Sequence, residues 1–308
     1  MPSANPRRVR ELDLSTGCPY VLFVCSSGHC SLDCAYCVAN PVAKHLPSLT
    51  YEDFSFLFER IGGRAFLIFS GKGDFFAGYR KPERLLDRLL HHDIEVALDI
   101  NGVILHEFAE LSSTQLSKIR FINLTLHYTQ VMKTNAAQAW IRNANTLIER
   151  KGGASFLSGL ILSPPERGLW REAVEFYERH VYRTTGQPLV LIQDVAHPFN
   201  ADDLALTDRL RNTYGDLVEE VHQEDFATRF AAFEHVLCPA GSRYFRIWND
   251  GRVEGCPYID TLRECGNLKQ RTFQPRNSTL FACRQARYCD CNNIALAGKM
   301  HFPNEVTS

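Results

Sequence analysis

Short apolar runs alternate with helix-length amphipathic segments along most of this chain, and this alternation limits the possible folds more than any other feature. The apolar runs are rich in Val, Ile, Leu and Phe, as fully buried strands are. We predict strands at residues 20–25, 65–69, 95–100, 121–126, 155–162 and 189–195. We predict helices at residues 51–61, 82–90, 136–151, 170–182 and 203–214. Strands that alternate with helices form parallel sheets, so the fold class is α/β, either a barrel or a doubly wound sheet.

The composition is that of an ordinary globular protein. The chain has 308 residues, of which 45% are hydrophobic and 22% charged, so it can bury a large core. Its net charge of -1 gives no electrostatic signature of nucleic acid or of an anionic membrane. Residues 1–13 lack an apolar signal segment, and no run of about 18 apolar residues indicates a membrane span. We therefore expect a cytoplasmic protein, in which eleven cysteines favour metal ligation over disulfides.

Three cysteines stand close together in the loop that follows the first predicted strand. Cys30, Cys34 and Cys37 have the spacing Cys-x3-Cys-x2-Cys, with Tyr36 directly before the last cysteine. A cubane iron-sulfur cluster is usually held by four thiolates, so three would leave one iron open to another ligand. Two alternatives are a zinc knuckle, for which His29 could supply the fourth ligand, and a redox thiol pair.

This loop resembles the signature of the radical S-adenosylmethionine (SAM) superfamily. The resemblance implies that Cys30, Cys34 and Cys37 hold a [4Fe-4S] cluster and that SAM chelates its open iron, with Tyr36 near the adenine. An electron from a reductant such as flavodoxin or ferredoxin then cleaves SAM to methionine and a 5′-deoxyadenosyl radical. The resemblance also implies a partial (β/α)6 TIM-like barrel, which binds its ligands at the C-terminal ends of the strands.

Polar residues follow the second and third predicted strands, where this family binds SAM. A glycine-rich segment there receives the methionyl amino group, and the matching positions are Ser70, Gly71, Lys72 and Gly73. The family's usual Gly-Gly-Glu-Pro is absent, which leaves the roles of Lys72 and Asp74 open. Asp99 and Asn101 resemble the positions that contact the ribose or carboxylate of SAM, although Asn101-Gly102 can equally be a simple turn.

The later strands end in groups that could transfer a proton. His127 and Tyr128 follow the fourth predicted strand, while Asp194 and His197 lie at the end of the sixth. We take His127, Tyr128 and Asp194 as candidates for substrate contact or acid-base work, with a purely structural hydrogen bond as the alternative for each.

A second group of cysteines follows residue 230, where we place the boundary between a barrel domain at 1–230 and a small α+β domain at 231–308. Cys238 and Cys256 flank a predicted β-hairpin with an Asn249-Asp250-Gly251 turn. This tail resembles the SPASM or Twitch extension of radical SAM enzymes, in which such cysteines bind an auxiliary [4Fe-4S] cluster. The remaining ligands would come from Cys283, Cys289 and Cys291.

The tail departs from the SPASM pattern, so we expect one auxiliary cluster instead of two. A four-cysteine structural zinc site would need the same ligands. Cys18, Cys25 and Cys265 have no assigned role, and Cys25 is most simply a small buried hydrophobic residue.

The resemblance implies abstraction of a substrate hydrogen, with net oxidation as the outcome. Most such families modify peptides, so oxidative peptide modification is the leading expectation. Dehydrogenation or rearrangement of a small molecule such as a sugar or aminocyclitol is the alternative, since the short segment before the first strand leaves no room for a leader-peptide-binding domain. A binding module held together by zinc is the non-enzymatic alternative.

Overall fold

The computed structural model describes residues 18–25, 29–37, 48–62, 64–71, 73–79, 83–194, 197–220, 237–238, 240–256, 263–275 and 281–282. The strands are β1 (Tyr20–Cys25), β2 (Ala65–Ser70), β3 (Ile94–Ile100), β4 (Ile119–Leu126), β5 (Ser155–Leu162), β6 (Leu189–Gln193), β7 (Val218–Glu220), β8 (Leu237–Cys238), β9 (Tyr244–Ile247), β10 (Val253–Glu254) and β11 (Phe281–Ala282). The α-helices are α1 (Tyr51–Ile61), α2 (Phe75–Gly78), α3 (Leu85–Leu89), α4 (Ser113–Leu116), α5 (Tyr128–Lys133), α6 (Ala137–Arg150), α7 (Trp170–Tyr177), α8 (Arg183–Thr185) and α9 (Ala201–Tyr214). The short 3-10 and π turns are η2 (Phe108–Glu110), η3 (Pro164–Leu169), η4 (Glu178–Tyr182) and η5 (Gly215–Leu217).

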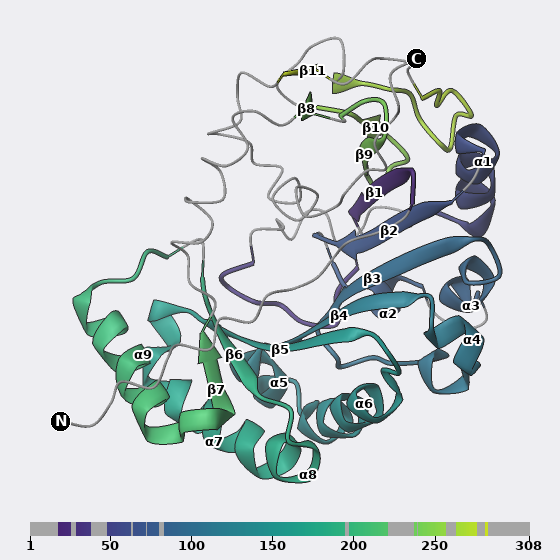
Figure 1. Cartoon of the computed structure of the whole chain (residues 1–308). Helices are drawn as coiled ribbons and strands as arrows, with labels where there is room; N and C mark the ends of the chain where they lie inside the picture. Colours follow the sequence, from purple (N-terminus) through teal and green to yellow (C-terminus); the bar gives the residue numbers. More distant parts are fainter. Residues whose placement is uncertain are drawn as a thin grey trace.

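A mostly parallel sheet is the frame of the described part of the chain. Its nine strands have the order β10-β9-β1-β2-β3-β4-β5-β6-β7. Strands β1 to β6 are all parallel and follow one another in chain order. A doubly wound sheet reverses its order at a switch point, so these six strands are singly wound. In Figure 1 the sheet curves into an arc, with α1, α3, α4, α6 and α8 along its outer side. The predicted α/β class is therefore confirmed.

The predicted strands all form, most with ends shifted by one or two residues, because each apolar run is buried. The strand at β1 is covered on both sides: Leu22 and Val24 belong to the core between sheet and helices, while Val21 and Phe23 belong to a second cluster on the inner face. Successive side chains of a strand point to opposite faces of the sheet, and both faces of β1 are covered by apolar side chains. The whole run is therefore hydrophobic. The predicted helix at 170–182 is divided into α7 and the π turn η4.

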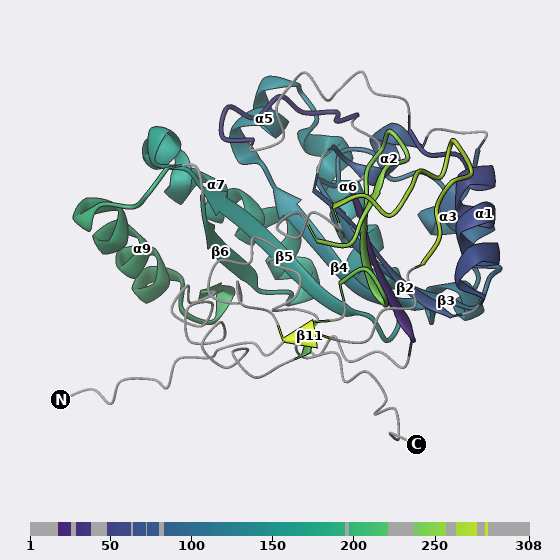
Figure 2. The ribbon, with the colours of Figure 1, turned by 90° about the horizontal axis from the view of Figure 1, so that it is seen from above.

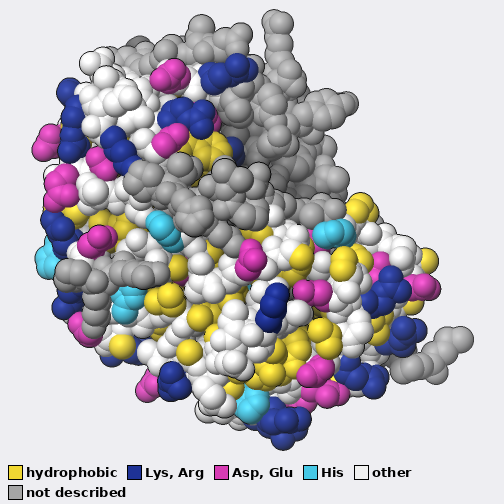
Figure 3. Space-filling view, turned by 180° about the vertical axis from the view of Figure 1, so that it is seen from behind, with side chains coloured by type: hydrophobic (Ala, Val, Ile, Leu, Met, Phe, Trp, Pro, Cys, Tyr) yellow, Lys and Arg dark blue, Asp and Glu magenta, His cyan; other side chains and the backbone are white. Residues whose placement is uncertain are grey.

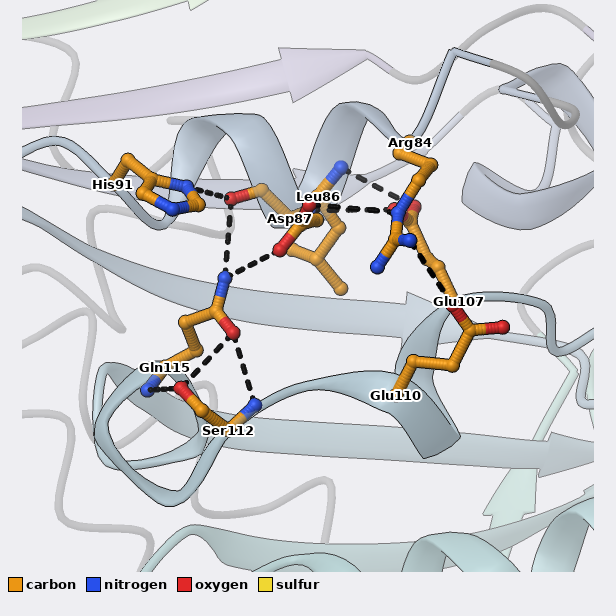
Figure 4. Close-up of polar contacts among 8 residues, drawn as sticks. All are labelled: Arg84, Leu86, Asp87, His91, Glu107, Glu110, Ser112 and Gln115. Carbon is orange, nitrogen blue, oxygen red and sulfur yellow. Dashed lines mark hydrogen bonds and ion pairs between the residues drawn. The ribbon is translucent and has the colours of Figure 1, made fainter.

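Helix α3 is shorter than predicted, and a side chain distant in sequence caps it. It begins after Arg84, which has a left-handed backbone (φ 43°) and gives no side-chain cap. The carboxylate of Glu107 instead accepts hydrogen bonds from the backbone N-H groups of Leu86 (3.2 Å) and Asp87 (3.3 Å) (Figure 4). These are N-H groups that a helix start leaves unpaired.

The hairpin predicted around Asn249-Asp250-Gly251 is confirmed, since β9 and β10 pair in antiparallel fashion. It does not stand apart from the large sheet, because β9 pairs in parallel with β1. Strands β8 and β11 form a separate two-stranded sheet. The predicted boundary at residue 230 lies outside the described residues.

The distribution of charged side chains on the surface agrees with the net charge of -1. Figure 3 shows acidic and basic side chains interspersed over the face seen from behind. In the part of the chain that the structure describes, no helix has the length and apolar character needed to cross a membrane.

Candidate functional site

The three-cysteine loop lies over the carboxyl ends of the central strands. Strand β1 leads into it, and the purple segment of residues 29–37 passes near α5 in Figure 2. The backbone N-H of Asp74, just after β2, donates to the carbonyl oxygen of His29 (2.6 Å). Cys30 and Cys34 are half-buried, while Cys37 is exposed. The backbone of the loop is therefore anchored to the segment after β2, while its thiols remain accessible to a ligand.

Two hydrogen-bond donors point at the sulfur of Cys30. The backbone N-H of Leu32 and the side-chain amide of Asn101 each lie 3.4 Å from its Sγ. Hydrogen bonds to cysteine sulfur are among the features that tune iron-sulfur clusters. The cysteine loop therefore contacts Asn101, at the end of β3, through Cys30, one of the predicted cluster ligands.

Burial keeps two of the thiols protonated. It raises the pKa of Cys30, and it raises that of Cys34 to about 12, with the neighbouring thiols Cys30 and Cys37 adding to the shift. Such thiols become thiolates when a bound metal compensates their charge. Within the described residues, no three or more His, Cys, Asp or Glu side chains are arranged to hold a metal ion.

The glycine-rich segment after β2 is a turn whose backbone conformation requires glycine. Gly71 (φ 92°) and Gly73 (φ 85°) both have positive φ. Asp74 follows them, caps α2 by accepting from the backbone N-H of Ala77 (3.1 Å), and accepts a second bond from the backbone N-H of Asn101 (2.7 Å). Asp74 therefore joins the glycine segment, the cysteine loop and the end of β3. Lys72, predicted to bind SAM, lies outside the described residues.

Asp99 lies at the centre of a polar link across three strands. Its carboxylate accepts hydrogen bonds from Ser70 Oγ at the end of β2 (2.8 Å) and from Asn123 Nδ2 on β4 (3.0 Å). Burial raises its pKa. The predicted residues Ser70 and Asp99 are thus brought together, and Asn123 is a partner that the sequence reasoning missed. A polar residue inside the apolar run of β4 was the available signal.

Asn101 closes a turn and also contacts the cysteine loop. Its Oδ1 accepts from the backbone N-H of Val103 (2.9 Å), which closes a turn, while its Nδ2 contacts Cys30 and donates to Ser31 Oγ (3.1 Å). The following Gly102 has φ 74°, and a Cβ there would lie 2.4 Å from Leu124 Cδ1. This turn therefore holds the amide against the loop.

Tyr36 is paired with His127. The Tyr36 hydroxyl lies 2.9 Å from His127 Nδ1, and the two rings stack with centroids 5.8 Å apart. Burial lowers the pKa of His127 to about 4, so its imidazole is neutral near pH 7. Burial also raises the pKa of Tyr36, with the charges of Cys34, Glu166 and Asp194 adding to the effect. The ring beside the last cysteine is thus fixed by the end of β4.

Asp194 forms a short polar chain at the end of β6. Its Oδ2 accepts from Ser163 Oγ (2.9 Å) and lies 2.6 Å from His197 Nδ1. Asp194 is buried, whereas 41% of the His197 side chain is exposed. Tyr128 lies elsewhere: its hydroxyl donates to Glu172 and its ring contacts Phe176, both on α7. Of the predicted acid-base groups, the structure brings His127 to the cysteine loop and pairs Asp194 with His197.

The second cysteine group is described only in part. Cys256 is buried on the inner face near β1, and Cys238 lies in β8. Cys283, Cys289 and Cys291 lie outside the described residues.

No protein-family model matches the chain, and no curated protein matches it either. The function is therefore inferred from the residues at the site.

Proposed function

We propose that this protein is a radical SAM enzyme on a partial (β/α)6 barrel, with Cys30, Cys34 and Cys37 as the ligands of a [4Fe-4S] cluster. The observation that carries the proposal is the meeting of the three-cysteine loop with Asn101 at the carboxyl end of β3. The parallel strands follow one another in chain order, which supports the barrel. Ligands of such barrels bind at the carboxyl ends of the strands, where the cysteine loop lies. When bound, the cluster supplies one electron and SAM supplies a 5′-deoxyadenosyl radical that abstracts a hydrogen atom.

The donor set fits such a cluster. Three thiols compatible with soft-metal binding lie on one loop, and Leu32 and Asn101 direct N-H groups at the sulfur of Cys30. With three ligands from the loop, one coordination position stays available for SAM. A zinc site would need a fourth protein ligand, for which His29 is the candidate.

Residues around the loop would orient SAM. Gly71 and Gly73 allow a ligand to approach the backbone closely. The Ser70-Asp99 pair presents a carboxylate where a ribose hydroxyl or an amino group can donate, and Tyr36 offers a ring fixed by His127. Because Asp74 joins these segments, the chain holds this part of the site in place before the ligand binds.

His197 and Asp194 would handle the proton that a net oxidation releases. The Asp194 carboxylate fixes His197 by a 2.6 Å contact at Nδ1, so Nε2 would be the ring nitrogen available to a substrate. The imidazole can then accept a proton, as a general base does. Oxidative peptide modification is the proposed reaction, with an auxiliary cluster in the tail. Dehydrogenation or rearrangement of a sugar or aminocyclitol is the second candidate reaction.

The test is anaerobic reconstitution with iron and sulfide, followed by reduction and addition of SAM. We expect 5′-deoxyadenosine from the natural chain and none from Cys30→Ala, Cys34→Ala or Cys37→Ala. Cys265→Ala is the matched control, since Cys265 is a buried cysteine of the outer core. A colourless, zinc-loaded chain that forms no 5′-deoxyadenosine would reject the enzyme and support a binding module.

A further inference from the structure

The polar atoms of the Asn101 side chain are all used by neighbouring residues. Its Oδ1 accepts from the backbone N-H of Val103 (2.9 Å). Its Nδ2 carries two hydrogens, and each has an acceptor on the cysteine loop: Cys30 Sγ at 3.4 Å and Ser31 Oγ at 3.1 Å. Only 5% of the residue is exposed. Asn101 therefore presents little surface, and no spare amide hydrogen, to a bound SAM.

The backbone around this amide holds it against the loop. The backbone N-H of Asn101 donates to Asp74 Oδ2 (2.7 Å), and Asp74 is itself 1% exposed. At the next position Gly102 has φ 74°, and an added Cβ would lie 2.4 Å from Leu124 Cδ1. Because backbone and side chain are both held, the Nδ2 group is directed at Cys30 before any ligand binds.

The sulfur that receives this bond is partly shielded from water. Cys30 packs half-buried against the outer core, whereas Cys37 is exposed. Water can donate to an exposed sulfur, so a protein donor adds little there. Away from water, a hydrogen bond to a charged atom is stronger. At Cys30, the N-H groups of Leu32 and Asn101 therefore take the place of water in stabilising negative charge.

We propose that the Asn101 amide is a positioning group that sets the reduction potential of the loop cluster through Cys30, and that it does not bind SAM. The inference rests on the proposed function, because it concerns the cluster held by the cysteine loop. Reduction of a [4Fe-4S] cluster adds one electron from the reductant. A hydrogen bond to a ligand sulfur stabilises the added negative charge, so it raises the reduction potential. Asn101 thereby makes the cluster easier to reduce.

The test introduces Asn101→Ala into the full-length chain that carries Cys238→Ala and Cys256→Ala, in which the loop cluster is the one expected. A redox titration followed by electron paramagnetic resonance, without SAM, measures the potential. Loss of the amide should make reduction about tenfold less favourable, which is a shift of about 59 mV to lower potential for one electron. Equilibrium dialysis of labelled SAM against the oxidised protein should show a dissociation constant changed by less than about threefold.

Ser31→Ala is the matched control, because it removes another partner of the same amide and leaves the donor to Cys30 in place. Its reduction equilibrium should stay within about threefold of the parent chain. Iron per chain and circular dichroism check that each variant is loaded and folded. If Asn101→Ala fails these checks, Asn101→Ser is measured with the same criteria. The serine hydroxyl can still close the turn with Val103, but it is shorter than the amide and does not reach Cys30 in its place.

An unchanged potential would overturn the inference. If SAM binding weakened at the same time, Asn101 would be a SAM contact, and if it did not, the amide would be purely structural. An equal fall in Ser31→Ala would overturn it as well. Unchanged potential beside a natural chain that cleaves SAM would refute this inference alone. A potential that depends on Asn101, beside a natural chain that cleaves no SAM, would refute the proposed function alone. A natural chain that takes up no cluster would refute both.

Discussion

Asp74 should be the residue whose loss most affects the architecture of the site, and Asp74→Ala is the change that tests this. The carboxylate accepts from the backbone N-H groups of Asn101 (2.7 Å) and Ala77 (3.1 Å), and the side chain is 1% exposed. Removing it leaves two buried donors without this acceptor, each at a cost of about 1–3 kcal/mol. Burial of the carboxylate offsets part of that, because it raises the pKa of Asp74 to about 6.

The expected net loss in the free energy of unfolding is therefore about 2–4 kcal/mol. Urea unfolding followed by circular dichroism at pH 7 measures it. Asp74→Asn is the matched variant: its Oδ1 still accepts one bond, so it should lose less than Asp74→Ala. Iron loading of the cysteine loop should fall in Asp74→Ala as well, since the carboxylate holds the backbone of Asn101, whose side chain contacts Cys30. A stability loss below about 1 kcal/mol would refute this account of Asp74.

Three other perturbations test separate parts of the structure. Burial raises the pKa of Glu107 from 4.5 to about 7. The folded chain therefore keeps a proton that the unfolded chain loses, and this stabilising contribution declines as pH rises from about 4.5 through 7. Glu107→Gln should flatten that part of the pH profile of unfolding, and an unchanged profile would contradict the argument. Gly102→Ala should destabilise the fold by at least about 2 kcal/mol, because its Cβ would lie 2.4 Å from Leu124 Cδ1. Gly152→Ala is the matched control: its φ is 57° but no atom lies within 4 Å of the added Cβ, so it should cost about 1 kcal/mol. Thermal unfolding measures both variants. His197→Gln should keep 5′-deoxyadenosine formation but lower product formation at least tenfold, and equal losses of both would exclude a role limited to proton transfer.

Local pattern was enough to predict the repeating part of the fold. The boundaries of β1, β5 and α1 match the predicted residues because each segment has one clear periodicity and clear end signals. Thr50 and Asp53 form a capping box at the start of α1, and Gly62 ends it with φ 65°. The cysteine loop then follows from its place after a buried strand.

Contacts between distant segments were not predictable in this way. The pairing of β1 with β9 joins residues more than 200 positions apart, and no periodicity in either strand specifies that neighbour. Glu107 caps α3 from 20 and 21 residues away, so the expected start of that helix was misplaced. At the site, the sequence identified the glycine segment. That Asp74 connects this segment to the cysteine loop and to the end of β3 became visible only from its hydrogen bonds in the structure.

The central claim is that the loop of Cys30, Cys34 and Cys37 holds a cluster with one iron left open for SAM. The most direct measurement is the electron paramagnetic resonance spectrum of the reduced, reconstituted protein that carries Cys238→Ala and Cys256→Ala, before and after addition of SAM. In this variant the loop cluster is expected to be the main source of signal. A spectrum that changes when SAM is added, and that disappears in Cys34→Ala, is the predicted result. A spectrum that SAM leaves unchanged, or that persists without Cys34, would contradict the claim.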